Sequence, residues 1–373
     1  MASPGPTTII VVIVDAPPAH RGARLRTVLC WLAVVPTALW AAVRLLGLDR
    51  GPLVQALAFT PYVAGVSVLV LALALALRRW WPAALAALAA VALLGTVAPR
   101  ALANSQPAAA GPTVRLLTAN LLAGAADART LVELVRRHEV DVLTVQEFTP
   151  EAQAALDQLG LDTLLPHRQL NPVVGTAGSG LYSRWPISDV GVRHNLEGWG
   201  FTQAYATVSV PGGPPVRVES AHPSAPYALD QVDAWRADLT AQPPATPDGG
   251  LRILAGDFNA TLDHSPLRAL LRTGYVDAAD ATGRGLTGTW GPYDGDLIPP
   301  VTIDHVLVDH RIAVRSVKVL NLPNTDHRPV QATLAATGAH LLIRCKNGRK
   351  LPILRRYHDG SFTSLIGGLP IRV

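Results

Sequence analysis

The chain has 373 residues, 49% of them hydrophobic, and a formal net charge of +5 with a pI near 9.5. Basic and acidic residues number 8 and 2 in residues 1–110, 17 and 24 in residues 111–337, and 7 and 1 in residues 338–373. A sequence-independent nucleic-acid binder needs a basic face to neutralise phosphates, so the acidic central stretch argues against that class. Both cysteines, Cys30 and Cys345, lie outside this stretch, which excludes a disulfide-stabilised central domain.

Three apolar stretches account for the positive mean hydropathy of +0.26, namely Thr27–Leu46, Leu53–Leu77 and Trp80–Ala98. Each has about the ~20 residues that cross the hydrocarbon core of a bilayer. The sequence therefore predicts a cytoplasmic segment at 1–26 and a three-helix membrane anchor at 27–98. Arg44 lies close enough to the end of its stretch for its side chain to snorkel to the interface.

Arginine placement predicts the orientation of this anchor. The arginines on the predicted cytoplasmic side are Arg21, Arg24 and Arg26 before the first stretch, and Arg78 and Arg79 between the second and third. Loops rich in Lys and Arg stay in the cytoplasm. With three crossings, the residues after Ala98 are expected to be extracytoplasmic, and the protein is expected to be a multi-pass cell-membrane protein.

Two further segments flank the central domain. Residues 99–112 are rich in Ala and Pro and predict a linker, in which Ala101-Leu102-Ala103 resembles a signal-peptidase site, so release by cleavage there is the alternative to a permanent anchor. The basic residues 338–373 predict a loosely ordered extension, with contact to anionic lipid head groups as the alternative.

Residues 113–337 alternate short β-branched runs with amphipathic stretches. The expected strands include 114–119, 140–145, 216–220, 251–255, 303–308, 314–320 and 329–334, and the expected helices are 127–138, with Asp127 as its N-cap, 151–159 and 229–239. No Gly-rich nucleotide fingerprint is present. This pattern predicts an α/β fold of two packed mixed sheets flanked by helices.

Short polar clusters stand at or near the ends of the expected strands. They are Thr118-Ala119-Asn120, Gln146-Glu147, Ser220-Ala221-His222, Gly256-Asp257-Phe258-Asn259, Ile303-Asp304-His305 and Thr325-Asp326-His327-Arg328-Pro329-Val330. Strand ends are where α/β folds build their sites. Taken singly, each cluster has an ordinary structural explanation, such as a turn, a cap or a local ion pair. Their ordered occurrence in one domain predicts a single metal-dependent site that cleaves phosphate esters.

The chemistry of phosphate-ester cleavage suggests a role for each residue. Mg²⁺ prefers oxygen ligands, so Glu147 is the expected main ligand with Asn120 beside it. Asp257 is expected to take the proton of the attacking water, while Asn259 holds a phosphate oxygen. The imidazoles of His222 and His327 can then bind phosphoryl oxygens or protonate the leaving group.

Two more carboxylates complete the predicted site. Asp304 is expected to orient His222, and Asp326 is expected to orient His327 or to bind the metal. The loop Gly288–Pro300 precedes Asp304 and is expected to shape substrate access, with Trp290 as a packing residue.

These clusters resemble the ordered motifs of the endonuclease/exonuclease/phosphatase superfamily over about residues 113–335, with GDFN and DHRPV the most specific of them. The superfamily includes deoxyribonuclease-like nucleases, abasic-site endonucleases, inositol polyphosphate phosphatases and neutral sphingomyelinases. The resemblance implies a four-layer αββα sandwich, dependence on Mg²⁺ with Mn²⁺ as the alternative, and the site roles given above.

The anchor refines this resemblance. Three spans followed by an exported domain resemble the membrane-anchored bacterial branch that is associated with glycopeptide-antibiotic resistance and envelope lipid phosphates. The implied function is hydrolysis of a phosphate or pyrophosphate ester at the outer membrane surface, on a lipid-linked cell-wall intermediate or a phospholipid. An exported Mg²⁺-dependent nuclease and an inactive phosphate-binding sensor are the alternatives. The expected partners are the bilayer and this substrate, with nucleic acid less favoured and no protein partner inferred.

Overall fold

The computed structural model describes residues 19–107, 111–195, 200–292 and 297–336, and the backbone of three short strands in the C-terminal extension. These strands are β13 (Arg355–Arg356), β14 (Phe362–Ile366) and β15 (Leu369–Arg372), which pair antiparallel. The other residues of the extension lie outside the described residues, as do 293–296 of the expected access loop.

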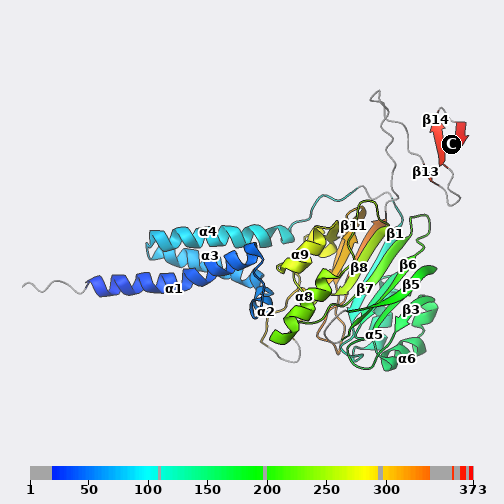
Figure 1. Ribbon diagram of the computed structural model, residues 1–373, viewed down its shortest axis with the longest axis horizontal. Coiled ribbons are helices and arrows are strands. Elements are labelled where there is room, and N and C mark those ends of the chain that lie inside the picture. The colour runs from blue at the N-terminus through cyan, green and yellow to red at the C-terminus, as the bar shows by residue number, and fades with distance from the viewer. Residues whose placement is uncertain are drawn as a thin grey trace, which may run out of the picture. The chain divides into compact units, whose positions relative to one another are not determined.

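The described chain divides into two compact units. The helical unit takes the residues up to Ala42 and Tyr62–Leu94, and the sandwich unit takes Val43–Pro61 and the residues from Gly95 onward. The first helices are α1 (Ala19–Leu46), α2 (Leu53–Leu57), α3 (Thr60–Ala76), α4 (Trp80–Val97) and the 3-10 helix η1 (Ala98–Ala101). Figure 1 shows these elements and the sandwich unit with its strands.

Among the described residues, two helical stretches are long and apolar enough to cross a membrane, Arg24–Leu46 and Trp80–Ala101. They coincide with the first and third expected stretches. The prediction of three spans is corrected, because the third apolar helix, α3, has only 17 residues. The expected stretch Leu53–Leu77 is broken after Leu57.

The apolar side chains of α2 explain this break. Val54 and Leu57 are fully buried, and Val54 belongs to a core cluster of the sandwich unit. Their hydropathy serves protein packing, which composition alone cannot distinguish from contact with lipid. The side chain of Arg44 also differs from its expected snorkelling position, since it is 8% exposed and bound to the carboxylate of Asp263.

Two six-stranded sheets form the centre of the sandwich unit. The first sheet has the order β11-β12-β1-β2-β4-β3, with β1 (Thr113–Asn120), β2 (Val142–Gln146), β3 (His167–Asn171), β4 (Ser179–Ser183), β11 (Ile312–Val319) and β12 (Val330–Ala336). The second has the order β5-β6-β7-β8-β10-β9, with β5 (Ile187–His194), β6 (Thr202–Val208), β7 (Val216–Ala221), β8 (Leu251–Asp257), β9 (Tyr275–Asp277) and β10 (Asp304–Asp309). In each sheet one central pair is parallel, β1 with β2 and β7 with β8.

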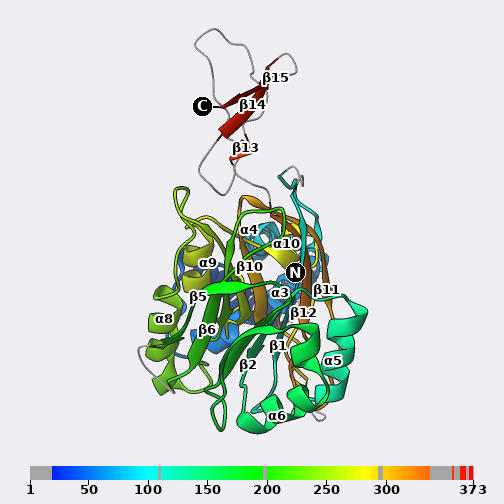
Figure 2. The same ribbon diagram turned by 90° about the vertical axis from the view of Figure 1, so that its right-hand side faces the viewer.

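Helices cover the outer face of each sheet, as Figure 2 shows. On the first sheet lie α5 (Ala128–Arg137), α6 (Pro150–Gln158) and α7 (Leu161–Leu164), and on the second lie α8 (Val232–Thr240), preceded by η2 (Leu229–Gln231), and α9 (Ser265–Leu271), while α10 (Ala278–Ala281) follows β9. The side chain of Asp127 accepts a hydrogen bond from the Thr130 amide and caps α5, as predicted. The predicted α/β sandwich of two mixed sheets flanked by helices is confirmed.

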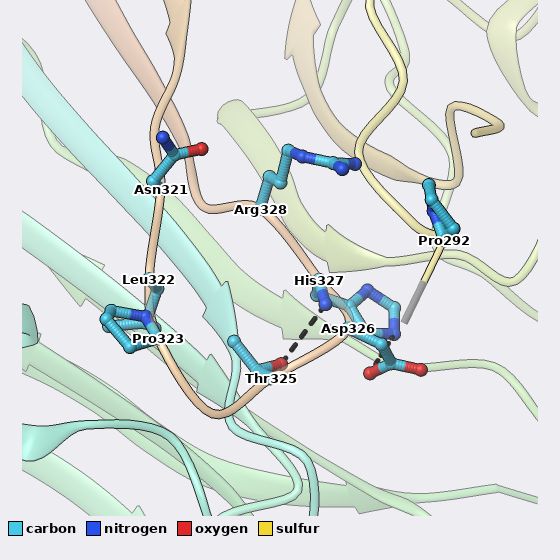
Figure 3. A pocket seen from close by; sticks show the side chains of 8 residues that line it. All are labelled: Pro292, Asn321, Leu322, Pro323, Thr325, Asp326, His327 and Arg328. Carbon is cyan, nitrogen blue, oxygen red and sulfur yellow. Dashed lines mark hydrogen bonds and ion pairs between the residues drawn. The ribbon is translucent and has the colours of Figure 1, made fainter. Parts of the chain in front are cut away.

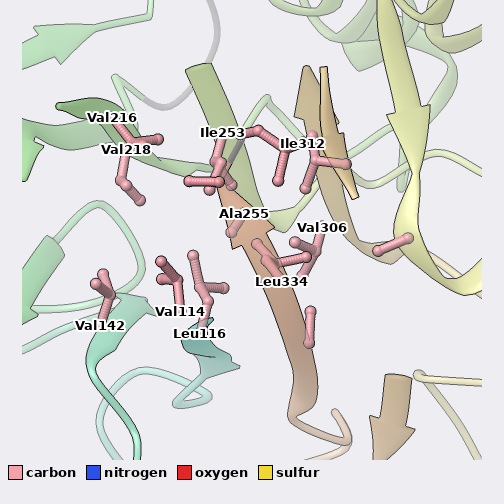
Figure 4. Close-up of a cluster of buried hydrophobic side chains, with 14 of the residues drawn as sticks. Val114, Leu116, Val142, Val216, Val218, Ile253, Ala255, Val306, Ile312 and Leu334 are labelled. Carbon is pink, nitrogen blue, oxygen red and sulfur yellow. The ribbon is translucent and has the colours of Figure 1, made fainter. Parts of the chain in front are cut away.

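Small and β-branched side chains fill the space between the sheets (Figure 4). Leu116 and Val142 of the first sheet and Val218, Ile253 and Val306 of the second are all at most 1% exposed in one cluster. Sheets whose inner faces interlock in this way hold their strand ends in fixed positions. Side chains at one end of β1, β2, β7 and β8 can therefore form a rigid site.

A buried ion pair next to this core gives stability a predictable pH dependence. The Nδ1 atom of His305 lies 2.7 Å from Asp277 Oδ2, and its Nε2 atom lies 2.9 Å from the Ala260 carbonyl oxygen. Both neighbours are acceptors, so both ring nitrogens donate and the imidazole is charged. Burial opposes this charge, but the Asp277 carboxylate raises the pKa of His305 above its ordinary value.

A raised pKa in the folded state stabilises the protein fully below the unfolded histidine pKa of ~6.5, and this contribution is lost as the pH rises through the folded value. We expect the melting temperature of the wild type to fall from pH 6.5 toward pH 9 by more than that of His305→Gln. The difference should be on the order of a few degrees for a domain of this size. Thermal unfolding of both proteins across this range checks it, and parallel profiles would contradict it.

Candidate active site

The polar clusters meet at one edge of the sandwich because of strand direction. Asn120 ends β1 and Glu147 follows the parallel strand β2, while His222 follows β7 and Asp257 ends the parallel strand β8. Strand β10 is antiparallel to β8, and its first residue, Asp304, is the register partner of Asp257. Strand β12 is antiparallel to β1, so the segment before it, with Asp326 and His327, returns to the same edge.

Asp257 lies at the centre of this group. Its Oδ2 atom accepts a hydrogen bond of 3.1 Å from Asn120 Nδ2, and it lies 3.6 Å from His327 Nε2 and 3.8 Å from His222 Nε2. Its Oδ1 atom accepts the backbone N–H of Asn259 at 2.8 Å. Burial raises the pKa of Asp257 to about 7, although the neighbouring charge of His327 opposes the rise. A carboxylate with a pKa near neutrality is suited to accept a proton.

Gly256 permits this arrangement. A Cβ atom at Gly256 would lie 1.9 Å from the carbonyl oxygen of Ala221, the residue before His222. A side chain there would force apart the ends of β7 and β8, next to His222 and Asp257. The glycine of the GDFN cluster therefore sets the spacing between His222 and Asp257.

Glu147 is held by Asn120 and by backbone. Its Oε1 atom accepts from Asn120 Nδ2 at 3.1 Å and its Oε2 atom accepts from the Ala123 amide at 2.7 Å. Its φ is +53°, a left-handed conformation that is costly for a side chain of this size. Burial raises the pKa of Glu147, and the two hydrogen bonds only partly offset this rise.

The two histidines have different environments. His327 Nδ1 lies 2.9 Å from Asp304 Oδ2, and although burial opposes the charged form, Asp304 and Asp257 raise the pKa of His327 to about 10. His222 is stacked on Phe201 at 4.2 Å between ring centroids, and burial lowers its pKa to about 3. His327 is therefore an imidazolium at neutral pH and His222 is neutral.

The expectation that Asp304 orients His222 is wrong, because its carboxylate binds His327. Strand β10 is antiparallel to β8 and strand β12 is antiparallel to β1, so Asp304 at the start of β10 and His327 before β12 meet at the same edge of the two sheets, which sequence order does not reveal. His222 Nδ1 is buried and has no hydrogen-bond partner among the described residues. The side-chain amide of Asn259 donates to the Pro223 carbonyl at 3.1 Å, so one of its two N–H groups is already used.

Asp326 is held by a residue that sequence reasoning assigned to packing. Trp290 Nε1 donates a hydrogen bond of 2.8 Å to Asp326 Oδ2, while Asp326 Oδ1 is buried with no hydrogen-bond partner among the described residues. The sequence did contain a signal for this contact, because the indole N–H of Trp290 is a hydrogen-bond donor and lies in the loop that precedes the Asp304 cluster. A cavity of about 220 Å³ adjoins these residues, lined by Pro292, Asn321, Leu322, Pro323, Thr325, Asp326, His327 and Arg328 (Figure 3).

Two sets of residues could be considered for a metal. Asp257, Asp304 and His327 have ligand atoms within 4.8 Å of one another. However, both ring nitrogens of His327 face carboxylates, and a protonated imidazole cannot bind a metal. The oxygen donors of Glu147 and Asp326, with Asn120 between the sheets, fit a hard divalent cation better.

The charge of the group supports this fit. Glu147, Asp257, Asp304 and Asp326 are four carboxylates around the single imidazolium of His327. An excess of negative charge in a buried place is costly unless a cation compensates it. The buried Oδ1 atom of Asp326, which has no hydrogen-bond partner among the described residues, fits a ligand of such a cation.

The model of the endonuclease/exonuclease/phosphatase family matches residues 117–327, and the chain belongs to this family. Members of the family are generally hydrolases of phosphoesters and typically depend on a divalent metal. A comparison with curated proteins found no match.

Several solved structures are similar to the chain. A humanised D. rerio TDP2 is 13% identical, with 60% of this chain and 98% of that chain covered and a TM-score of 0.49. An endonuclease/exonuclease/phosphatase from Beutenbergia cavernae is 18% identical, with 67% and 80% covered and a TM-score of 0.48. A mannosyl-6-phosphatase from Bacteroides thetaiotaomicron is 17% identical, with 59% and 99% covered and a TM-score of 0.46.

Replacing Trp290 tests whether it positions Asp326. We expect Trp290→Phe, which keeps the ring but removes the N–H, to weaken activation by a divalent metal about 10- to 100-fold, the usual effect of losing a residue that orients a ligand. The measurement is the metal concentration that gives half-maximal hydrolysis of a phosphoester. Trp185→Phe is the control, since the side chain of Trp185 packs against the inter-sheet core. An unchanged metal requirement in Trp290→Phe would refute the role.

Proposed function

We propose that this protein is a membrane-anchored, Mg²⁺-dependent phosphohydrolase that cleaves a phosphate or pyrophosphate ester at the outer membrane surface. The observation that carries the proposal is the convergence of Asp257, two histidines and the Glu147–Asn120 pair within hydrogen-bonding or ion-pair distance. This combination offers a base, hydrogen-bond donors and oxygen ligands at one place.

Each side chain has a distinct part in the proposed reaction. Asp257, held by Asn120 and by the Asn259 amide, takes the proton of the attacking water. The imidazolium of His327, fixed by Asp304, donates to a phosphoryl oxygen and neutralises its charge. Neutral His222 offers a further ring N–H, and the remaining amide N–H of Asn259 is available to a phosphate oxygen.

Glu147, Asn120 and Asp326 would hold the metal ion. When bound, Mg²⁺ would supply positive charge for the phosphoryl oxygens and the leaving oxygen. Trp290 donates to Oδ2 of Asp326, and the Ala123 amide donates to Oε2 of Glu147. These hydrogen bonds fix the orientation of both carboxylates, so Oδ1 of Asp326 and Oε1 of Glu147 are the oxygens proposed to bind the metal.

Connectivity supports anchorage with the site outside the cytoplasm. The end of α1, the connector Val43–Pro61 and the return from α4 at Gly95 all belong to the sandwich unit. Arg24 lies 20 residues before Arg44 in α1, a rise of about 30 Å, which is the thickness of a bilayer core. Arg78 and Arg79 follow α3, at the turn where the chain is furthest along its path from the sandwich unit.

The two stretches of membrane-spanning length, Arg24–Leu46 and Trp80–Ala101, each lead along the chain from a segment with arginines to the sandwich unit. Because arginine-rich segments prefer the cytoplasm, the proposed location of the sandwich unit is the opposite side of the membrane. Alkaline phosphatase fused after residue 336 is expected to be active in cells, and a fusion at Arg79 is expected to be inactive. The reverse pattern would refute this orientation.

The proposed substrate is a lipid-linked cell-wall intermediate or a phospholipid. Confinement of the enzyme to the membrane raises its effective concentration toward lipids and not toward soluble esters. The acidic charge of residues 111–337, with 17 basic and 24 acidic residues, disfavours a polyanion such as DNA.

A phosphate-release panel tests the proposal. The full chain in nanodiscs with Mg²⁺ is offered polyprenyl pyrophosphate, phosphatidic acid as the phospholipid and plasmid DNA, with EDTA and Asp257→Ala as controls. We expect Mg²⁺-dependent release from a lipid substrate that both controls abolish. Plasmid nicking without release from lipids would favour a nuclease, and Mg²⁺ binding with no turnover of any ester would favour a sensor.

A further inference from the structure

Asp263 is a buried acid that the proposed reaction does not use. It lies in the loop between β8 and α9, six residues after Asp257. Its carboxylate accepts hydrogen bonds from Arg44 Nε at 2.5 Å and from Arg100 Nη1 and Nη2 at 2.8 and 2.6 Å. Its side chain is 0% exposed, and the two arginines are 8% and 7% exposed.

The position of the two arginines is informative. Arg44 lies near the end of Arg24–Leu46 and Arg100 lies near the end of Trp80–Ala101, the two stretches of membrane-spanning length. One carboxylate therefore binds the domain-side end of both stretches. The bidentate geometry to Arg100 fixes direction as well as distance.

The next two residues bind the connector Val43–Pro61. His264 Nδ1 accepts the Thr261 amide at 2.8 Å, so its proton is on Nε2, which donates to the Val54 carbonyl of α2 at 2.8 Å. The amide and hydroxyl of Ser265 donate to the carboxylate of Asp49 at 2.7 and 2.5 Å. We call Asp263, His264 and Ser265, with Arg44, Asp49, Val54 and Arg100, the anchor clamp.

The clamp is close to the site along the chain. Asn259 precedes Asp263 by four residues, a span of at most ~14 Å even if fully extended. The loop after β7 is held as well, because Gln55 Nε2 of α2 donates to the Pro226 carbonyl at 2.7 Å, four residues after His222. Both loops that carry reacting side chains are thus fastened to the segment that continues into the apolar helices.

Stability alone does not account for such a clamp. A buried ion pair loses much of its attraction to desolvation, and apolar residues of similar volume would stabilise about as well. What a charged, bidentate contact adds is a fixed position. At a bilayer surface, that position sets the depth at which Asp257 and Asn259 meet a phosphate.

We infer that Asp263 is a positioning residue whose clamp holds the loop of Asp257 and Asn259 at head-group depth, so that the enzyme selects phosphate esters carried by the bilayer over soluble ones with the same reacting group. This inference rests on the proposed function. Asp263 acts through the position of the loop and does not contact the phosphate.

The test compares two substrates that differ only in their tails. The full chain in nanodiscs is assayed with polyprenyl pyrophosphate in the same nanodiscs and with isopentenyl pyrophosphate in solution. We expect the wild type to prefer the embedded substrate. Asp263→Asn should lower kcat/KM for the embedded substrate at least 10-fold and change that for the soluble substrate by less than about 3-fold.

Asp309→Asn is the matched control. Asp309 is also a fully buried carboxylate paired with an arginine, Arg311 at 2.6 Å, but it lies at the far end of β10 from Asp304. Asp309→Asn should leave unchanged the ratio of kcat/KM for the embedded substrate to kcat/KM for the soluble substrate. A merely structural role of Asp263 would lower both activities together, as a loss of folded protein does.

Asp49→Asn covers the case in which Asp263→Asn does not fold, because the asparagine oxygen can still accept from Ser265 while the charge is removed. A fall in the substrate ratio in either clamp variant supports the inference. It is overturned if the wild type shows no preference, or if the ratio is unchanged in Asp49→Asn and in any folded Asp263→Asn. A wild type that releases phosphate from neither substrate refutes hydrolysis of a lipid-linked pyrophosphate and, together with no hydrolysis of phospholipid in the panel above, refutes the proposed function itself.

Discussion

Asp257→Asn is expected to lower kcat/KM for phosphate release by about 10²- to 10⁴-fold, the contribution of a well-placed general base. The variant keeps the size of the side chain, and its oxygen can still accept the Asn259 amide that now binds Asp257 at 2.8 Å. The other end would present an NH₂ group to the NH₂ of Asn120, with no lone pair for the proton of water. The loss of turnover should therefore far exceed the moderate loss of thermal stability that a buried donor facing another donor causes.

Asp141→Asn is the control for this substitution. Asp141 is also a buried carboxylate with a pKa raised foremost by burial, but it precedes β2 at the opposite end from Glu147 and is bound by Arg184. We expect it to keep activity within a few-fold while losing some thermal stability. Retention of more than a tenth of wild-type activity by Asp257→Asn would show that another group takes the proton.

Strand ends were predictable because local sequence encodes them. The runs before Asn120, Glu147 and Asp257 are apolar and β-branched, and the change to polar residues marks the end of burial. The parallel pairs β1–β2 and β7–β8 then bring these ends to one edge. Local patterns therefore indicated which residues meet.

Pairing within the site was not predictable in the same way. Asp304 was expected beside His222, yet it binds His327, because the order of strands across two packed sheets decides the neighbour. The hydrogen bond from the indole N–H of Trp290 to Asp326 was not predicted for the same reason. The two residues are 36 positions apart, and a contact at that separation leaves no periodic pattern in the sequence. Residue type suggests chemistry, and only topology assigns partners.

The anchor shows a further limit. Hydropathy predicted Leu53–Leu77 as one span, but the side chains of α2 are buried in protein. Arg44 was expected to reach toward water, whereas Asp263, 219 residues away, binds it inside the fold. A segment buried in lipid and a segment buried in a protein core have the same apolar composition. Which part of a chain lies in lipid and which part lies in protein therefore depends on contacts that sequence patterns do not contain.

Asp304→Asn and His327→Gln are each expected to lower kcat/KM by about 10²- to 10⁴-fold, and the double variant is expected to be no worse than the more severe single one. The reason is that the pair acts as one unit, in which the Asp304 carboxylate 2.9 Å from Nδ1 keeps His327 charged. The measurement is a double-mutant cycle on phosphate release at saturating Mg²⁺. Losses that multiply would show that the two residues act separately.

The pH profile distinguishes this charge effect from a loss of orientation alone. Asp304 and Asp257 raise the pKa of His327 to about 10 against the effect of burial, so the imidazolium persists below that pH and is lost above it. Without the charge of Asp304, the pKa of His327 falls. The alkaline limb of kcat/KM should therefore move to lower pH in Asp304→Asn, whereas His327→Gln should lose this limb altogether. If Asp304 only orients the ring, the alkaline limb of Asp304→Asn stays where it is in the wild type and only its height falls.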